Sequence, residues 1–364
     1  MKEQKERLEH SRICFITTPG EITWTGNSKY DDPTNIAPYL NRVADIDVVK
    51  LDQIHQPKDL SKEVAEAIHS RLNEYNGFVV TAGKFDLQYI APRLAFAFGP
   101  NLNRTIIVTG SNIPASAILS NARETLIRAA IAANTPFNEV AILFNDLILR
   151  GVSYQLKPDG SNITYRPYRS QEQNLNRYSG QLGEVTANGV EIDCLQTKTT
   201  SGKMKFLPDV ESNIVSFGIS PGTEPEFIEE VALRSAGLVL YSETAHLPSR
   251  EPYSFLPLVN NLTRKEIPTL VLGRAINDPS IGHKLSAGER IIDKLGGITT
   301  RHMNPTVAVT KFSWVIKRVE EQIASGDISK EDKITKIKEW MGKPYVGEFG
   351  INRPFHVGVE EIHA

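Results

Sequence analysis

Two short apolar strands in the first hundred residues each run into a glycine turn that carries charged side chains. The first ends in Thr17-Thr18-Pro19-Gly20-Glu21, and the second ends in Thr81-Ala82-Gly83-Lys84-Phe85-Asp86. Ligands of open α/β sheets bind at the carboxyl ends of strands, so the two turns bracket a predicted pocket. A partly buried glutamate can act as an acid, a base or a covalent nucleophile, and a desolvated lysine can act as a base or a Schiff-base amine. The residues in these turns therefore indicate acid–base or nucleophilic chemistry.

The composition indicates a soluble globular protein. The chain has 364 residues, of which 40% are hydrophobic and 23% charged, and this length predicts two domains. Its 41 basic and 43 acidic residues give a formal net charge of −2, which argues against nucleic acid or a membrane surface as a partner. The start of the chain shows no signal peptide, and no apolar run approaches the ~20 residues needed to span a bilayer. We therefore expect a cytoplasmic protein.

The residues that commonly bind metals or cofactors form no recognised motif. Cys14 and Cys194 have neither metal spacing nor a disulfide framework, and no phosphate or dinucleotide turn is present. We therefore expect no metal and no cofactor. His55 and His246 lie near the expected site, but the default interpretation of both is a surface histidine.

Strands and helices alternate through the first half, which predicts a mostly parallel sheet with helices on both faces. Apolar runs predict strands at Ile13–Thr17, Ile46–Leu51, Phe78–Thr81, Thr105–Thr109 and Val140–Phe144. Helical spacing predicts helices from Ser61, as the cap, to Tyr75, and at Ile90–Phe98 and Asn121–Ala133.

The sequence pattern changes between Gly151 and Asp209, where the residues are mostly polar and apolar residues recur with little periodicity. We expect a surface loop at Gln171–Ser179. Alternation returns at Asn213 and predicts a second, smaller α/β domain, which ends in a long helix from Pro305 to Ser325. We expect an N-terminal domain at 1–190, a linker at 191–212, a C-terminal domain at 213–325 and a tail at 326–364. An amphipathic helix at Ile328–Met341 is expected to pack on its own domain, with a partner-binding helix as the alternative.

Several collinear segments resemble the motifs of bacterial type I (cytosolic) L-asparaginases. They are Ile107-Val108-Thr109-Gly110-Ser111-Asn112-Ile113-Pro114, Ser120-Asn121-Ala122-Arg123-Glu124-Thr125-Leu126, Asn138-Glu139-Val140, Leu149-Arg150-Gly151, Ser220-Pro221-Gly222 and Pro305-Thr306-Val307-Ala308-Val309-Thr310-Lys311. The resemblance covers roughly residues 12 to 325. It implies a larger N-terminal and a smaller C-terminal α/β domain with an active site between them, a small amide or amino acid as substrate, and a homodimer or homotetramer.

The chain departs from this family at the reactive positions. Alignment on the family's T-G-G-T-I turn keeps the first threonine as Thr18 and puts Glu21 at the nucleophile. Alignment on H-G-T-D-T puts Lys84 at the second threonine and Phe85 at the aspartate, so the resemblance implies that Glu21 and Lys84 face each other. The family's catalytic lysine falls near Leu156, with Lys157 one place away.

The expected substrate-binding residues follow from the same alignment. The family's serine-containing turn falls near Gln56-Pro57-Lys58-Asp59, which implies Lys58 and Asp59 at that place. Tyr30 or Trp24 stands where the family carries a lid tyrosine. Ser111, Thr81, Gly83 and Asp86 are expected to support or bind the substrate. Asp86 is expected either to pair with Lys84 or to cap the helix that opens near Leu87, and the cap is the first expectation.

Three hypotheses remain open. The first is an asparaginase-fold enzyme with altered chemistry, in which Glu21 is the acid, base or nucleophile, Lys84 its partner and Thr18 a supporting group. The second is a pseudoenzyme that serves as a binding or regulatory subunit, in which the Glu21–Lys84 pair fills a disused pocket as a salt bridge. The third is an ordinary L-asparaginase in which Thr17 or Thr81 carries the reaction.

Overall fold

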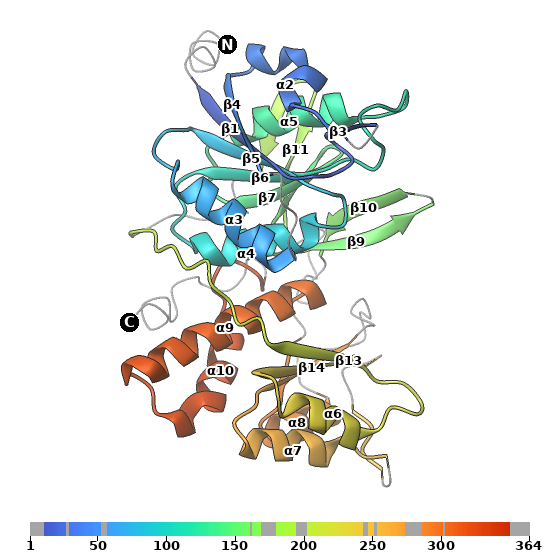
Figure 1. The fold of residues 1–364 in the computed structure, drawn as a ribbon, viewed down its shortest axis with the longest axis vertical. Helices are drawn as coiled ribbons and strands as arrows, with labels where there is room; N and C mark the ends of the chain where they lie inside the picture. The colour runs from blue at the N-terminus through green and yellow to red at the C-terminus, as the bar shows by residue number, and fades with distance from the viewer. Residues whose placement is uncertain are drawn as a thin grey trace. The chain divides into compact units, whose positions relative to one another are not determined.

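The computed structural model divides the chain into two compact units (Figure 1). It describes residues 11–26, 29–51, 57–160, 162–168, 180–193, 202–242, 247–250, 253–273, 286–300 and 303–349. The first unit holds the described residues up to Pro208 and the second those from Asp209 onwards. The division therefore falls inside the segment 191–212 that the sequence suggests as a linker. The expected loop at Gln171–Ser179 lies outside the described residues.

The first unit is built on an eight-stranded sheet with the strand order β12-β11-β8-β7-β6-β5-β1-β4. The five neighbouring strands β7, β6, β5, β1 and β4 pair in parallel. The strands β8, β11 and β12 extend the sheet beyond β7 by antiparallel pairing. The strands are β1 (Arg12–Thr17), β4 (Asp45–Lys50), β5 (Gly77–Thr81), β6 (Thr105–Thr109), β7 (Val140–Phe144), β8 (Leu147–Arg150), β11 (Gln181–Thr186) and β12 (Gly189–Ile192).

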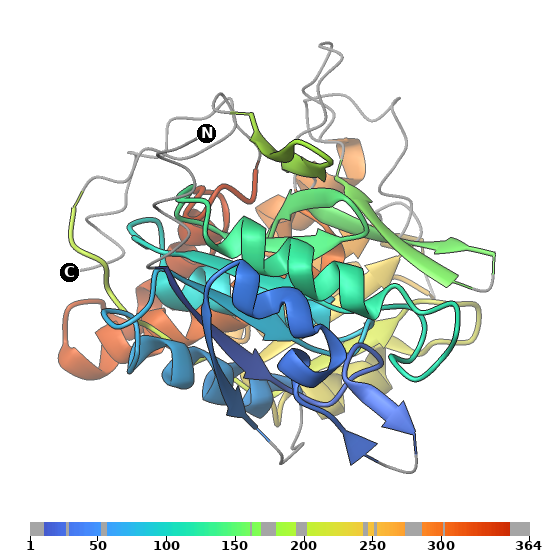
Figure 2. The ribbon, with the colours of Figure 1, turned by 90° about the horizontal axis from the view of Figure 1, so that it is seen from above.

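Helices cover both faces of this sheet, as the alternation of apolar segments predicts. One face carries α5 (Ala122–Ala133), with α2 (Pro33–Ile36) and the 3-10 turn η1 (Pro38–Arg42) beside it, and Figure 2 shows α5 lying across the strands. The other face carries α3 (Pro57–His69) and α4 (Leu87–Phe98) (Figure 1). Every residue of β5, β6 and β7 is buried, which explains why these strands read as continuous apolar runs.

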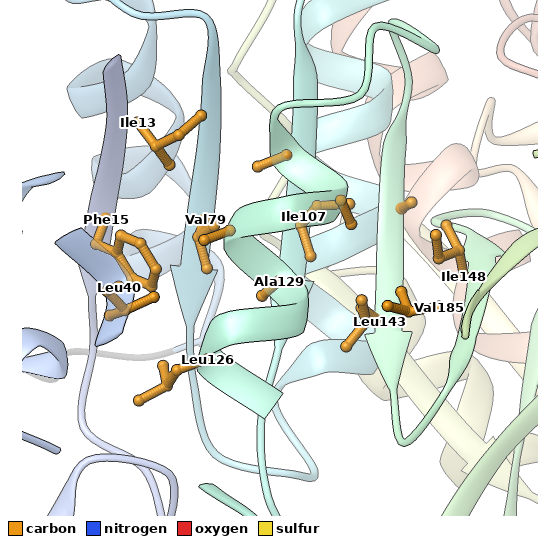
Figure 3. Close-up of a cluster of buried hydrophobic side chains, with 14 of the residues drawn as sticks. Ile13, Phe15, Leu40, Val79, Ile107, Leu126, Ala129, Leu143, Ile148 and Val185 are labelled. Atoms are coloured by element: carbon orange, nitrogen blue, oxygen red, sulfur yellow. The ribbon is translucent and has the colours of Figure 1, made fainter. Parts of the chain in front are cut away.

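The core between α5 and the sheet is drawn in Figure 3. Ile13 and Phe15 of β1, Val79 of β5, Ile107 of β6 and Leu126 of α5 belong to one cluster of hydrophobic side chains, and all of them are fully buried. This packing fixes the position of the strand ends that carry the candidate site, because a close-packed interior does not let strands slide.

Two short hairpins add to the first unit where the sequence pattern predicts no strands. The pair β2 (Trp24–Gly26) and β3 (Lys29–Tyr30) follows the first glycine turn. The pair β9 (Tyr154–Asp159) and β10 (Asn162–Pro167) forms an antiparallel ribbon. The alternation of apolar and polar residues that would predict these strands is weak, because each ribbon is short and partly exposed.

The beginning of α3 differs from the prediction. The helix starts at Pro57, so Ser61 lies inside it and is buried instead of serving as its cap. Proline suits the first turn of a helix, because its fixed φ is helical and its missing N–H has no helical partner there.

The second unit contains a four-stranded parallel sheet in the order β13-β14-β15-β16. Its strands are β13 (Ile214–Gly218), β14 (Gly237–Ser242), β15 (Thr269–Gly273) and β16 (Ile298–Thr299). One face packs against α6 (Pro225–Ala232), α7 (Leu256–Arg264) and α8 (Ala287–Lys294), and α9 (Pro305–Ser325) lies on the other (Figure 1). Among the described residues, no helix is both long and apolar enough to cross a bilayer.

The helix expected within Ile328–Met341 packs on its own unit, and the described residues of the tail end at Phe349. The 3-10 turn η2 (Lys330–Asp332) leads into α10 (Lys333–Met341), which packs on α9 and buries Ile337, Trp340 and Met341. Beyond α10, a buried ion pair joins Lys311 of α9 to Glu348, with 2.7 Å between Lys311 Nζ and Glu348 Oε1. Lys311 Nζ also donates to the carbonyls of Met341 and Lys343, and Glu348 accepts the backbone N–H groups of Tyr345 and Val346.

We expect the substitution Lys311→Met to destabilise the protein by about 3–5 kcal/mol, because it leaves the Glu348 carboxylate buried without its cation. Lys317→Met, which removes a half-exposed lysine from the same helix, is the matched control and is expected to change stability by less than about 0.5 kcal/mol. Urea unfolding of both variants measures the difference. Equal midpoints for the two variants would show that the buried pair does not hold the tail.

Candidate active site

Three neighbouring parallel strands end at the same level of the sheet. Thr17 of β1 pairs with Thr81 of β5, and Thr81 pairs with Thr109 of β6. Because the carboxyl ends of parallel strands share one edge, the turns that follow them lie together at the place where α/β sheets bind ligands.

The first two turns touch through their backbones. A side-chain carbon added at Gly20 would lie 2.5 Å from the Gly83 nitrogen and 2.5 Å from the Ala82 carbonyl carbon. A contact this short is impossible for a Cβ, so glycine at position 20 is required for the two turns to meet. The meeting of these turns sets the distance between the side chains that follow.

Thr18 ties the first turn to the second. Its N–H and its hydroxyl both donate to the carbonyl of Thr81, at 3.0 Å and 2.9 Å. Thr18 is buried, and its hydroxyl satisfies the backbone at this turn, as the sequence suggests. Thr81 is itself fully buried, and its hydroxyl has no hydrogen-bond partner in the part of the chain that the structure describes.

Glu21 and Lys84 face each other across these turns, as the resemblance implies. Lys84 Nζ lies 3.8 Å from Glu21 Oε1, and the Lys84 backbone N–H donates to Glu21 Oε2 at 3.2 Å. The Glu21 and Lys84 side chains are 30% and 18% exposed, so both are reachable from solvent. The long ion-pair distance leaves room for a third group to compete for either charge.

Lys84 is held by two residues that the sequence analysis did not identify. Its ammonium donates to the carbonyl of Asn112 at 3.2 Å, and its own carbonyl accepts the Tyr165 hydroxyl at 2.6 Å. Asn112 also exchanges two side-chain hydrogen bonds with the backbone of Ile163, which tethers the β9–β10 ribbon to the turn after β6. One signal was present: Asn112 replaces the glutamine of the I-V-T-G-S-Q-I-P motif. No sequence signal marks Tyr165.

Asp86 does not cap α4, contrary to the prediction. It occupies the N-cap position, but its side chain makes no cap hydrogen bond. A carbon added at Gly83 would lie 2.6 Å from Asp86 Oδ2 and 3.8 Å from Glu21 Oε2, so the two carboxylates flank the same glycine. Burial raises the pKa of the Asp86 carboxyl above its ordinary value, and the charge of Glu21 raises it further. The local backbone positions this carboxylate against another anion instead of at a helix N–H.

The other expected site residues lie at different distances from this centre. Ser111 is buried after β6 and donates its hydroxyl to the carbonyl of Ile113 at 2.8 Å. Tyr30 is exposed on β3 and packs edge-on against Trp24, with 5.2 Å between ring centroids. Lys58 and Asp59 fall in the first turn of α3, but their side chains lie outside the described residues, as does His246.

The resemblance puts the family's catalytic lysine near Leu156, and the neighbouring Lys157 is the lysine that could take its place. Lys157 is exposed on β9, and among the described side chains the cation that pairs with Glu21 is Lys84. The ammonium of this site therefore comes from the turn after β5. Across the described part of the chain, no three His, Cys, Asp or Glu side chains gather as metal ligands.

Comparison with known proteins gives a consistent family signal. Residues 12–162 match the protein family described as "Asparaginase, N-terminal". L-asparaginase 1 of Escherichia coli (strain K12) is 38% identical over 91 residues, which cover 25% of this chain and only 27% of that protein. L-asparaginase of Thermococcus kodakarensis is 24% identical over 300 residues, covering 78% of this chain and 85% of that protein. One subunit of the glutamyl-tRNA(Gln) amidotransferase from Methanobrevibacter smithii is 23% identical over 295 residues, covering 79% of this chain and 62% of that protein.

The same fold is seen in solved structures. The thermostable L-asparaginase from Thermococcus kodakarensis superposes with a TM-score of 0.76 over 94% of this chain and 100% of that chain, at 20% identity. A likeness at this identity shows the mixed α/β architecture and leaves the chemistry open.

We expect Asp86→Asn to raise the melting temperature at neutral pH by about 1–3 °C, because it removes a carboxylate that burial and Glu21 disfavour. A group whose folded-state pKa is raised stabilises the protein below its unfolded-state pKa and loses that contribution as the pH rises through the folded value. The advantage of the variant should therefore shrink as the pH falls toward about 4, the ordinary pKa of an aspartate. Thermal unfolding at a series of pH values measures it, with the exposed Asp159→Asn as control. A variant that is less stable at pH 7 would contradict the assignment.

Proposed function

This chain belongs to the asparaginase/glutaminase family and resembles its bacterial type I members, and from that premise we propose that it is an amidohydrolase-like enzyme with an altered reactive centre. Its substrate is a small amide, an amino acid or a peptide-derived compound. Glu21 and Lys84 replace the two threonines of the family, and Thr18 supports them. The observation that carries the proposal is the meeting of Glu21, Lys84 and Asp86 around Gly83 at the strand ends.

Glu21 is the base in this proposal. Its carboxylate takes a proton from a water molecule as the water oxygen attacks the amide carbonyl, and the electron pair of the C=O bond moves onto oxygen. The partly exposed Glu21 side chain leaves access for that water. A carboxylate can also attack the carbonyl itself and form an anhydride that water then opens, so the same residue supports a covalent route.

Lys84 is the electrophilic partner. Its ammonium stabilises the oxyanion and donates a proton to the departing nitrogen, which leaves as ammonia while the C–N bond breaks. The proton that Glu21 received then restores the Lys84 ammonium across the 3.8 Å gap. The carbonyl of Asn112 holds the ammonium in place, so Asn112 is a positioning residue.

The second candidate is a pseudoenzyme that serves as a binding or regulatory subunit. It is favoured by the contacts that already satisfy the reactive groups. Lys84 has both Glu21 and the Asn112 carbonyl as partners, and Glu21 accepts a backbone N–H. In this case the ion pair only fills the turn.

An ordinary L-asparaginase mechanism receives little support from the described hydroxyls. Thr81 is fully buried inside the sheet, and its hydroxyl has no hydrogen-bond partner among the described residues. The Thr17 hydroxyl donates to the carbonyl of Val49 at 3.5 Å. Val49 belongs to the neighbouring strand β4, so this hydroxyl is engaged on the β4 side of β1. We also keep a homodimer or homotetramer and a cytoplasmic location as parts of the proposal.

Separate Glu21→Gln and Lys84→Met variants test the proposed function. A screen of small primary amides for ammonia release should identify a substrate, and each variant should lower kcat by about 100-fold or more, because each removes a group that acts in the transition state. Lys157→Met on β9 is the matched control and should retain the wild-type rate.

The outcome separates the candidates. Ammonia release that survives both substitutions rules out the altered reactive centre. Absence of turnover, together with ligand-induced stabilisation, favours the binding subunit.

A further inference from the structure

The two carboxylates and one ammonium of the site give it an excess of negative charge. Glu21 and Lys84 neutralise each other, with 3.8 Å between their charged atoms. Asp86 has no such cation among the described side chains. The charged neighbour that acts on it is Glu21, and that charge is repulsive. When all three are ionised, Glu21, Lys84 and Asp86 therefore have a net charge of −1.

The Asp86 carboxylate also makes no hydrogen bond to the N–H groups at the start of α4. A residue at the start of a helix ordinarily accepts a helix N–H, but Asp86 makes no cap hydrogen bond. Its oxygen instead lies beside Gly83, on the side where Glu21 lies. Holding two carboxylates around one glycine destabilises the folded chain. Unfavourable charge arrangements of this kind are concentrated at functional sites, where a bound ligand can compensate the charge.

An exposed aromatic ring lies near the Lys84 ammonium. Phe85 stands between Lys84 and Asp86 in the chain and is 52% exposed. Its ring centroid lies 5.6 Å from Lys84 Nζ, so the ring already accepts one cation near its face. Tyr89, within the first turn of α4, is also exposed.

We propose that this site selects amides that carry a positive charge and no nearby carboxylate, with Asp86 binding the ammonium or guanidinium group of the ligand and Glu21 repelling anions. The proposal rests on the proposed function, because it names the class of substrate for the same centre. A cation placed beside Asp86 removes the repulsion between the two carboxylates. A ligand carboxylate in the same place meets two anions and one ammonium that is already paired. Asp86 recognises charge here, and Glu21 and Lys84 perform the bond chemistry.

Three primary amides with a four-carbon chain provide the test: 4-aminobutanamide with charge +1, butanamide with charge 0 and succinamate with charge −1. Isothermal titration of the full chain measures their binding, and ammonia release is followed in parallel. We expect 4-aminobutanamide to bind about tenfold or more tighter than butanamide, with succinamate weakest, as one uncompensated carboxylate predicts.

Asp86→Asn should remove this preference, so that 4-aminobutanamide loses about tenfold in affinity and butanamide is unchanged. Asp159→Asn on β9 is the control and keeps the wild-type order. Glu21→Gln is the second variant, and it should raise the affinity for succinamate. Thermal unfolding verifies that each variant is folded.

The results distinguish this inference from the proposed function. Equal binding of the three amides, tighter binding of succinamate, no binding of 4-aminobutanamide, or an unchanged order in Asp86→Asn overturns the charge selection. A preference for 4-aminobutanamide without ammonia release supports the selection and overturns the enzyme proposal. Ammonia release from succinamate as fast as from 4-aminobutanamide supports the enzyme and overturns the selection.

Discussion

The backbone contact between two glycine turns is the constraint on which the candidate site depends. Parallel pairing of β1 with β5 and of β5 with β6 puts the ends of three strands at one level. Gly20 then lets the first turn lie against Ala82 and Gly83, at a distance that any side chain would prevent. The buried core beneath, formed by β1, β5, β6 and α5, holds the strands in this register. The distance between Glu21 and Lys84 follows from that contact.

Electrostatics within this geometry separate two roles for the acidic residues. Glu21 has a cationic partner and a backbone N–H, so its charge is compensated. Asp86 lies against Glu21 without a helix-cap contact. In the proposed function this difference assigns the bond chemistry to Glu21 and the recognition of the ligand to Asp86. A buried pair elsewhere, Lys311 with Glu348, shows the contrasting arrangement, in which both charges are enclosed and compensate each other.

Several parts of the fold were predictable because local chemistry specifies them. The continuous apolar runs of β5, β6 and β7 predict strands covered on both faces, and Pro305 predicts the first residue of α9. The ribbon β9–β10 was not predictable, since its pattern is short and its stability comes from Asn112 and Tyr165, which contact residues far away in the chain. The start of α3 and the helix-capping contact expected of Asp86 were predicted incorrectly. Asp86 occupies the N-cap position with helical dihedrals, φ −81° and ψ −24°, whereas a side chain that caps a helix N–H ordinarily belongs to a residue in the β region.

Residue types and short spacings were enough to indicate the family resemblance and the order of strands and helices in the first half, and to suggest Glu21 and Lys84 as the residues at the two reactive positions. Such features are local, so they can be read along the chain without knowing how it folds. The folded chain was needed to show that Lys84 is anchored by Asn112 and Tyr165, that Lys157 stays on the surface, and that Asp86 faces Glu21. Each of these depends on atoms brought together across tens of residues by sheet register and turn contact, which no local pattern encodes.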